Sequence, residues 1–137
     1  MWSAPDLSNP TAVGAAFVQV YATQDAAVDP SPWAAPARAS RFATPAYAKA
    51  LRSATSTGGD EMWQQLVDYD AATVVGVEPA AVAAAPADTA AVVYRAYRVR
   101  IEGQDDKGWS STAVQTHIVK LVKHSGAWAV DNSQLVG

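Results

Sequence analysis

The second half of the chain alternates between apolar and polar residues in two long runs. The first run extends from Thr89 to Glu102 and the second from Trp109 to Lys123, with the Gly- and Asp-containing segment 103–108 between them. Alternation with a period of two is typical of β-strands, and a Gly/Asp turn between two such runs predicts a β-hairpin. Each strand would have about fourteen residues, whereas strands usually have about five or six. A hairpin of that length needs a second layer packed along it.

Two shorter strands are predicted on either side of this hairpin. One is the β-branched segment from Ala72 to Glu78, which stops before Pro79. The other follows the turn 124–126 and extends from Ala127 to Asp131. The segment 80–88, rich in Ala, Val and Pro, is predicted to be an irregular edge or a loop. Together these segments predict an antiparallel sheet of three or four strands.

The first part of the chain predicts helices. A capping side chain precedes a proline at three places, which are Asn9, Ser31 and Thr44. The first helix is predicted from Pro10 to about Gln24, because apolar residues recur there at helical spacing. They are Val13, Ala16, Phe17, Val20 and Tyr21.

Two shorter helices are predicted to follow. The second starts at Pro32 and would place Trp33, Ala37 and Phe42 inward and Arg38 and Arg41 toward solvent. The third starts at Thr44 and would bury Tyr47, Ala48 and Leu51 while exposing Lys49 and Arg52. The segment 53–60 is a loop by composition. The segment 61–68 fits either a helical turn or the approach to a strand.

Helices followed by a meander of strands predict an α+β domain in which N-terminal helices pack on a curved three- to four-stranded antiparallel sheet. A chain of 137 residues is long enough for one domain. Residues 10–137 are predicted to form it, with residues 1–9 as a linker or a trimmed N-terminus. The domain would lie on the extracytoplasmic face of the cell membrane if a native anchor precedes Met1, and in the cytoplasm otherwise.

The amino-acid composition argues against several classes of function. The net charge of −3, from 10 basic and 13 acidic residues, argues against nucleic acid as the main partner. The sequence has no cysteine, which excludes disulfides, thiol catalysis and Cys-zinc sites, and its two histidines leave little for a metal. It contains no phosphate-loop, dinucleotide or zinc-protease motif and no run of eighteen apolar residues. No cofactor and no metal are expected.

The closing segment Gly126-Ala127-Trp128-Ala129-Val130-Asp131, together with the order of elements, resembles the nuclear transport factor 2-like superfamily. Within it, the helix around 15–21 and the tryptophan at Trp33 are most similar to extracytoplasmic domains of TcpC-like conjugation (type IV secretion) scaffold proteins. This resemblance implies a non-enzymatic protein–protein assembly domain. Its partners would be other subunits of a membrane-associated complex and further copies of itself, and its contact with the membrane would come only through a segment absent from this chain. No catalytic residues come with the resemblance.

Other members of the superfamily are cavity enzymes, such as polyketide cyclases and isomerases, and they supply the main alternative. His117 lies in the middle of a predicted strand, and Asp68 and Asp70 precede the first strand. An acid/base pair would need His117 and one of these carboxylates together in a cavity. The structural alternatives are a half-buried strand histidine and carboxylates that cap a turn. A ligand-binding cone without chemistry is a third possibility.

Binding residues are predicted on the first long strand. Arg98, Arg100 and Glu102 share one face because they alternate, whereas Tyr97, Val99 and Ile101 lie on the other. One face is therefore charged and the other apolar, which is common at subunit contacts. The alternative is a strand that passes from the core to solvent. Four tryptophans at element boundaries are predicted to lock helices onto the sheet: Trp33, Trp63, Trp109 and Trp128.

Overall fold

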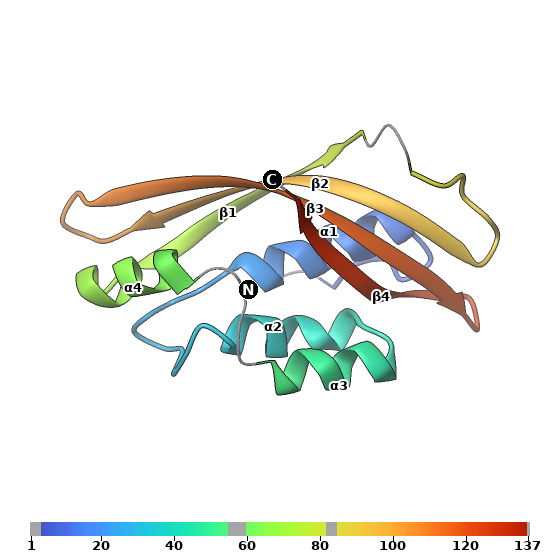
Figure 1. Cartoon of the computed structure of the whole chain (residues 1–137), viewed down its shortest axis with the longest axis horizontal. Coiled ribbons are helices and arrows are strands. Elements are labelled where there is room, and N and C mark those ends of the chain that lie inside the picture. The colour runs from blue at the N-terminus through green and yellow to red at the C-terminus, as the bar shows by residue number, and fades with distance from the viewer. Residues whose placement is uncertain (1–3, 55–59, 82–84, 137) are drawn as a thin grey trace.

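The computed structural model describes residues 4–54, 60–81 and 85–136. Its sheet has four antiparallel strands in the order β1-β2-β3-β4, and the helices lie on one side of it (Figure 1). The strands are β1 (Ala72–Ala80), β2 (Val92–Gln104), β3 (Ser110–His124) and β4 (Ala127–Val136). The helices are α1 (Pro10–Ala22), α2 (Ala34–Ala39), the 3-10 helix η1 (Ser40–Phe42), α3 (Pro45–Ser53) and α4 (Asp60–Tyr69). The predicted α+β class and the long β2–β3 hairpin are confirmed.

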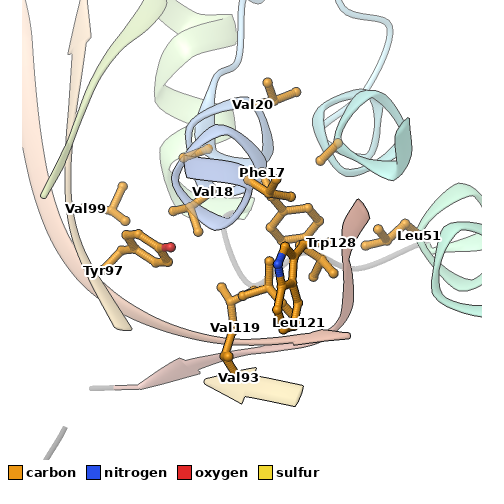
Figure 2. Close-up of a cluster of buried hydrophobic side chains, with 14 of the residues drawn as sticks. Phe17, Val18, Val20, Leu51, Val93, Tyr97, Val99, Val119, Leu121 and Trp128 are labelled. Atoms are coloured by element: carbon orange, nitrogen blue, oxygen red, sulfur yellow. The ribbon is translucent and has the colours of Figure 1, made fainter. Parts of the chain in front are cut away.

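The core lies between helix α1 and the inner face of the sheet. Figure 2 shows Phe17 and Val18 of α1 among side chains that come from the strands. The fully buried strand residues are Tyr97, Val99, Val119, Leu121 and Val130. Burying each such side chain contributes roughly 1.5–3 kcal/mol relative to leaving it in water. The predicted apolar face of β2 is therefore confirmed.

Helix α1 approaches strand β2 so closely that only glycine fits at position 14. A Cβ placed on Gly14 would overlap the hydroxyl oxygen of Tyr97 and lie 2.9 Å from its Cζ atom. The Tyr97 hydroxyl donates a hydrogen bond to the backbone oxygen of Thr11 at 2.8 Å, which satisfies this buried polar group. Burial also raises the pKa of Tyr97 above its ordinary value. The missing side chain at position 14 thus sets the spacing between helix and sheet.

The ends of strands β1, β2 and β4 differ from the predicted ends. Strand β4 extends to Val136 because, beyond a bulge at Lys120/Leu121, its pairing with β3 continues to Thr116. Strand β1 includes Pro79, which an edge strand tolerates because it is paired on one side only. Strand β2 begins only at Val92, since the Thr89 hydroxyl accepts a hydrogen bond from the Val92 N–H at 2.9 Å and makes a turn there.

Helix ends differ for a similar reason. Helix α1 stops at Ala22, two residues before the predicted end, because Gln24 and Thr73 exchange hydrogen bonds. The Gln24 N–H donates to the Thr73 hydroxyl at 2.9 Å, and the Thr73 N–H donates to the Gln24 carbonyl at 2.9 Å. The predicted caps Asn9 and Thr44 are confirmed, since both accept a backbone hydrogen bond from the first turn. Ser31 caps no helix, because α2 begins only at Ala34.

Helix α4 shows that the segment with two interpretations is helical, so the described residues contain one α-helix more than the three predicted. Its Leu66 is fully buried against β2, where the lack of a side chain at Gly103 leaves room for it. The Tyr69 ring at the end of α4 stacks on Trp109 with 4.4 Å between centroids. The 53–60 segment predicted as a loop falls partly within α3 and α4, and residues 55–59 lie outside the described part.

The predicted locking role is confirmed for Trp109 and for Trp128, which is buried in the core. It is wrong for Trp33, whose side chain is exposed at the start of α2. Trp63 on α4 is half-buried.

The predicted orientation of the second helical segment is confirmed for Arg41, which is exposed, and for Phe42, which packs against the core, but it is wrong for Arg38. Helix α2 buries Ala35, Pro36 and Ala39. Arg38, predicted to face solvent, instead holds the buried carboxylate of Asp29, with N–O distances of 2.6 and 3.1 Å, and also donates to the Thr23 carbonyl at 2.9 Å. This clamp joins the end of α1, the following loop and α2. A short helix turns its arginine inward when a buried carboxylate would otherwise have no counter-charge.

Breaking this clamp is expected to destabilise the domain. The Asp29→Ala change leaves Arg38, 34% of whose side chain is exposed, without its carboxylate, and we expect the free energy of unfolding to fall by about 2 kcal/mol. Urea unfolding measures this loss. Asp88→Ala is the matched control, because it removes an exposed carboxylate from Arg95 and should have a much smaller effect. Equal losses in the two variants would contradict the clamp's role.

Candidate functional site

The outer face of the sheet, turned away from the helices, carries the predicted binding residues. Arg98 and Arg100 are exposed and Glu102 is half-buried. On strand β1 they lie opposite Glu78, Gly76 and Val74, respectively. The Arg98 Nε lies 3.7 Å from the Glu78 Oε1, a pair that is too exposed to contribute much to stability. These side chains therefore remain open to a partner.

A groove crosses this face where strand β1 lacks a side chain. It has a volume of about 320 Å³ and is lined by Gly76, Val77, Glu78, Arg98, Arg100 and Val114. Apart from Gly76 and its two chain neighbours, no atom of the described residues lies within 4 Å of a Cβ placed on Gly76, so the groove is open above this residue. A second hollow of about 250 Å³, between Tyr94 and Gln134, continues along the same face.

The rim of the outer face is apolar at several points. The side chains of Val74, Val114 and Val136 have exposed fractions of 59, 42 and 44%. Arg98 and Arg100, the carboxylates of Glu78 and Glu102, and exposed valines thus share one surface. Such a mixture of apolar contact and charge is suited to recognising another protein, because the apolar part supplies affinity and the charges supply register.

The inner face of the sheet has a cavity of its own, of about 120 Å³. Its walls come from α1, α3, α4 and the strands, and its polar lining residues include Tyr21, Tyr47, Gln115, His117 and Ser133. The His117 Nε2 lies 3.1 Å from the Gln115 Oε1, and the Tyr47 hydroxyl lies 2.8 Å from the Ser133 Oγ. Burial lowers the pKa of His117 to about 4, so the imidazole is neutral at pH 7. Burial, with a smaller effect of Tyr47, raises the pKa of Tyr21.

The structure does not bring His117 together with the carboxylates of the alternative pair. Asp68 is exposed on α4 and accepts a hydrogen bond from the Gln64 side chain at 3.0 Å. Asp70 is exposed in the turn between α4 and β1, with a φ of 52°. It borders a separate groove, together with Asp25, Asp105 and Asp106. Neither carboxylate lines the cavity that contains His117.

Sequence reasoning assigned the other cavity residues to different roles. Tyr21 and Tyr47 were predicted to be ordinary inward-facing helix residues, and Ser133 lay beyond the predicted end of the last strand. The two tyrosines line the same cavity because helices α1 and α3 lie on the same face of the sheet (Figure 1). Their hydroxyl groups could have indicated a polar site in the sequence, since a tyrosine on a buried apolar stripe needs a hydrogen-bond partner.

A membrane-spanning helix would need to be long and apolar, and a metal site would need a cluster of ligating side chains. None of the helices in the described residues is long and apolar enough to cross a membrane. Within residues 4–54, 60–81 and 85–136, no three His, Cys, Asp or Glu side chains group in a way that would hold a metal ion.

The geometry defines a curved sheet with helices on its concave face and an uncovered, mixed outer face. Comparison with solved structures finds this architecture in the VirB8 protein of Agrobacterium tumefaciens, with a TM-score of 0.52 over 97% of this chain and 96% of that chain. The two sequences are 17% identical, so the match shows a common fold. The predicted resemblance is thereby confirmed for the fold. No family model matches the chain, and no curated protein sequence does either.

Proposed function

We propose that this chain is a non-enzymatic assembly domain of a type IV secretion, or conjugative transfer, complex, and that it contacts other subunits through the outer face of its sheet. The observation that carries the proposal is the fold shared with VirB8 over nearly the whole of both chains. The proposal assigns residues 10–137 to one domain. It would lie on the extracytoplasmic side of the membrane, anchored through a segment outside this sequence.

The outer face supports this role because its two arginines, Arg98 and Arg100, have no strong partners on the described part of the chain. Arg98 has only a long, exposed contact with Glu78, and Arg100 lies beside the open groove above Gly76. A partner that brings a carboxylate to this groove would form charge-assisted hydrogen bonds with a planar guanidinium. The exposed Val74 and Val114 on neighbouring strands would add apolar contact at the same place.

The inner face supports an assembly role in a different way. The rings of Phe17, Tyr21, Tyr47 and His117 pack against one another, with centroid distances of 5.7 to 6.1 Å. They fill the concavity and leave about 120 Å³, whereas pockets for drug-sized ligands usually measure about 300–1,000 Å³. The concave side of the sheet is thus used mainly for packing against the helices, and the outer side is the surface available for contact with another subunit.

Self-association tests the proposal directly. We expect the purified chain to form oligomers in sedimentation equilibrium, and the double change Arg98→Glu with Arg100→Glu to weaken them about tenfold or more by reversing the charge of the contact. High salt should also weaken the wild-type oligomer. Arg52→Glu is the matched control, because Arg52 is an exposed arginine on α3, below the opposite face. Unchanged association of the double variant, or a wild-type chain that stays monomeric, would contradict this contact surface.

A further inference from the structure

The cavity on the inner face is lined in part by aromatic rings and carries hydrogen-bonding groups that the described part of the chain does not use. Tyr21 comes from α1, Tyr47 from α3 and His117 from β3, and the Tyr21 and His117 rings meet edge to face with 5.8 Å between centroids. The apolar part of the wall comes from Ala22, Pro32, Met62, Ile101, Ala113 and Leu135. A flat ring would therefore find faces and edges of other rings around it.

His117 is the most informative of these residues, because only 2% of it is exposed and yet half of its hydrogen-bonding capacity is unused. Its Nε2 is paired with the Gln115 side-chain oxygen. A neutral imidazole that donates from Nε2 presents Nδ1 as an acceptor, with the tautomer assigned from this hydrogen bond. Among the described residues, no group donates to that nitrogen. Within the described part of the chain, the Arg38 Nε is the only side-chain atom that is fully buried without a hydrogen-bond partner, so the His117 Nδ1 is not sealed in the core and keeps accessible surface.

Tyr21 offers a second unused group in the same cavity. Its side chain lines the wall, and its hydroxyl makes no hydrogen bond within the described part of the chain. The Tyr47 hydroxyl, in contrast, is already shared with Ser133. The cavity therefore presents an acceptor at His117 and a donor or acceptor at Tyr21 to a molecule that enters it, beside the side-chain amides of Gln24 and Gln115 that also line it.

The size and charge of the cavity limit what it can hold. A cavity of about 150 Å³ lined by apolar residues accepts benzene, so about 120 Å³ corresponds to a single small ring. The described lining residues carry no formal charge at neutral pH, which disfavours ions, because a desolvated charge without a counter-charge is costly.

We propose that this cavity is a binding site for a small neutral aromatic molecule with one hydroxyl group, of about the size of phenol. The ligand's hydroxyl donates to the His117 Nδ1 and accepts from the Tyr21 hydroxyl, and its ring lies between the aromatic walls. The site is on the opposite side of the sheet from the proposed assembly surface, so the two functions are tested separately.

Nuclear magnetic resonance titrations with three probes of similar shape test the proposal: phenol, toluene and benzoate. We expect phenol to bind saturably in the millimolar range, as a ligand of seven heavy atoms with modest efficiency would, and to shift the methyl signals of Ile101 and Leu135. The Val74 methyls on the outer face should not move. Toluene should bind about tenfold more weakly, because it leaves the His117 acceptor unpaired, and benzoate should not bind measurably.

Matched variants test whether phenol binds in this cavity. Ala113 lines the cavity and Val114 faces the other way on the same strand, so Ala113→Leu should abolish phenol binding and Val114→Leu should leave it unchanged. Tyr21→Phe, which keeps the ring, should weaken phenol binding about fivefold to tenfold and toluene binding not at all. Equal affinity for phenol and toluene, retained binding in Ala113→Leu, or no saturable shift with phenol would each overturn the proposal.

Discussion

The Gly14→Ala variant is expected to lose about 2–3 kcal/mol of folding free energy, although alanine is the better helix former. The added Cβ would overlap the Tyr97 hydroxyl and lie 2.9–3.0 Å from two of its ring carbons. Overpacking of this kind costs about 1–3 kcal/mol, and displacing the hydroxyl from the Thr11 carbonyl costs about 1 kcal/mol more. The gain in helix propensity returns at most about 1 kcal/mol. Thermal unfolding should show a midpoint lower by roughly 10 °C.

Two further variants test the cause of this loss. Gly76 lies on the exposed face of β1, and apart from Gly76 and its two chain neighbours no described atom lies within 4 Å of the position that a Cβ would take there, so Gly76→Ala should be neutral or slightly stabilising. Gly14→Ala combined with Tyr97→Phe should recover part of the loss relative to the sum of the single changes, because the overlapping oxygen is gone. Additive effects of the two changes, or a wild-type midpoint in Gly14→Ala, would show that helix α1 is free to move away from the sheet.

Acidification is expected to destabilise the domain through His117. In the unfolded chain this histidine has its ordinary pKa of about 6.5, and burial lowers the folded-state pKa to about 4. The unfolded state therefore binds the proton first as the pH falls. Stability should be complete above pH 6.5, decline between pH 6.5 and 4, and lose about 3 kcal/mol over that window, at about 1.4 kcal/mol per pH unit.

The groups around His117 make it the main source of this change within the cavity. Its polar neighbours there include Tyr21, Tyr47, Gln115 and Ser133, and none of the described residues that line the cavity is a carboxylate, a lysine or an arginine. Urea unfolding at several pH values measures the effect. His117→Leu should remove most of the decline, whereas His124→Leu, which changes an exposed histidine at the end of β3, should preserve it. An unchanged decline in His117→Leu would assign the acid sensitivity to carboxylates instead.

The sequence predicted the buried residues correctly in elements whose apolar residues recur periodically and pack on one side. The stripe on α1 and the alternation on β2 identified the buried residues Val13, Phe17, Val20, Tyr97 and Val99. The charged face of β2 was recognised for the same reason, since alternation determines which side chains share a face. The caps Asn9 and Thr44 were recognisable because a capping bond joins residues only three positions apart.

The errors occur where a residue's partner is distant in the sequence or the pattern is short. Arg38 was assigned to solvent because its carboxylate, Asp29, lies in a loop without periodicity. The end of β4 was missed because residues 132–136 are mostly polar and exposed, and they are held as a strand by pairing with β3. Residues 61–68 fitted two structures because a stretch of eight residues carries too little pattern to choose.

Local chemistry thus determined the α+β class, most of the order of elements and the two faces of strand β2, because these depend on spacing along the chain. The tertiary structure alone decided which of those faces is covered. It placed the helices on the side of Tyr97 and left the side of Arg98 and Arg100 open. It also gathered Tyr21, Tyr47 and His117 around one cavity while leaving Asp68 and Asp70 outside it. Such placements depend on how the helices cross the sheet, and that geometry comes from packing between residues far apart in the chain.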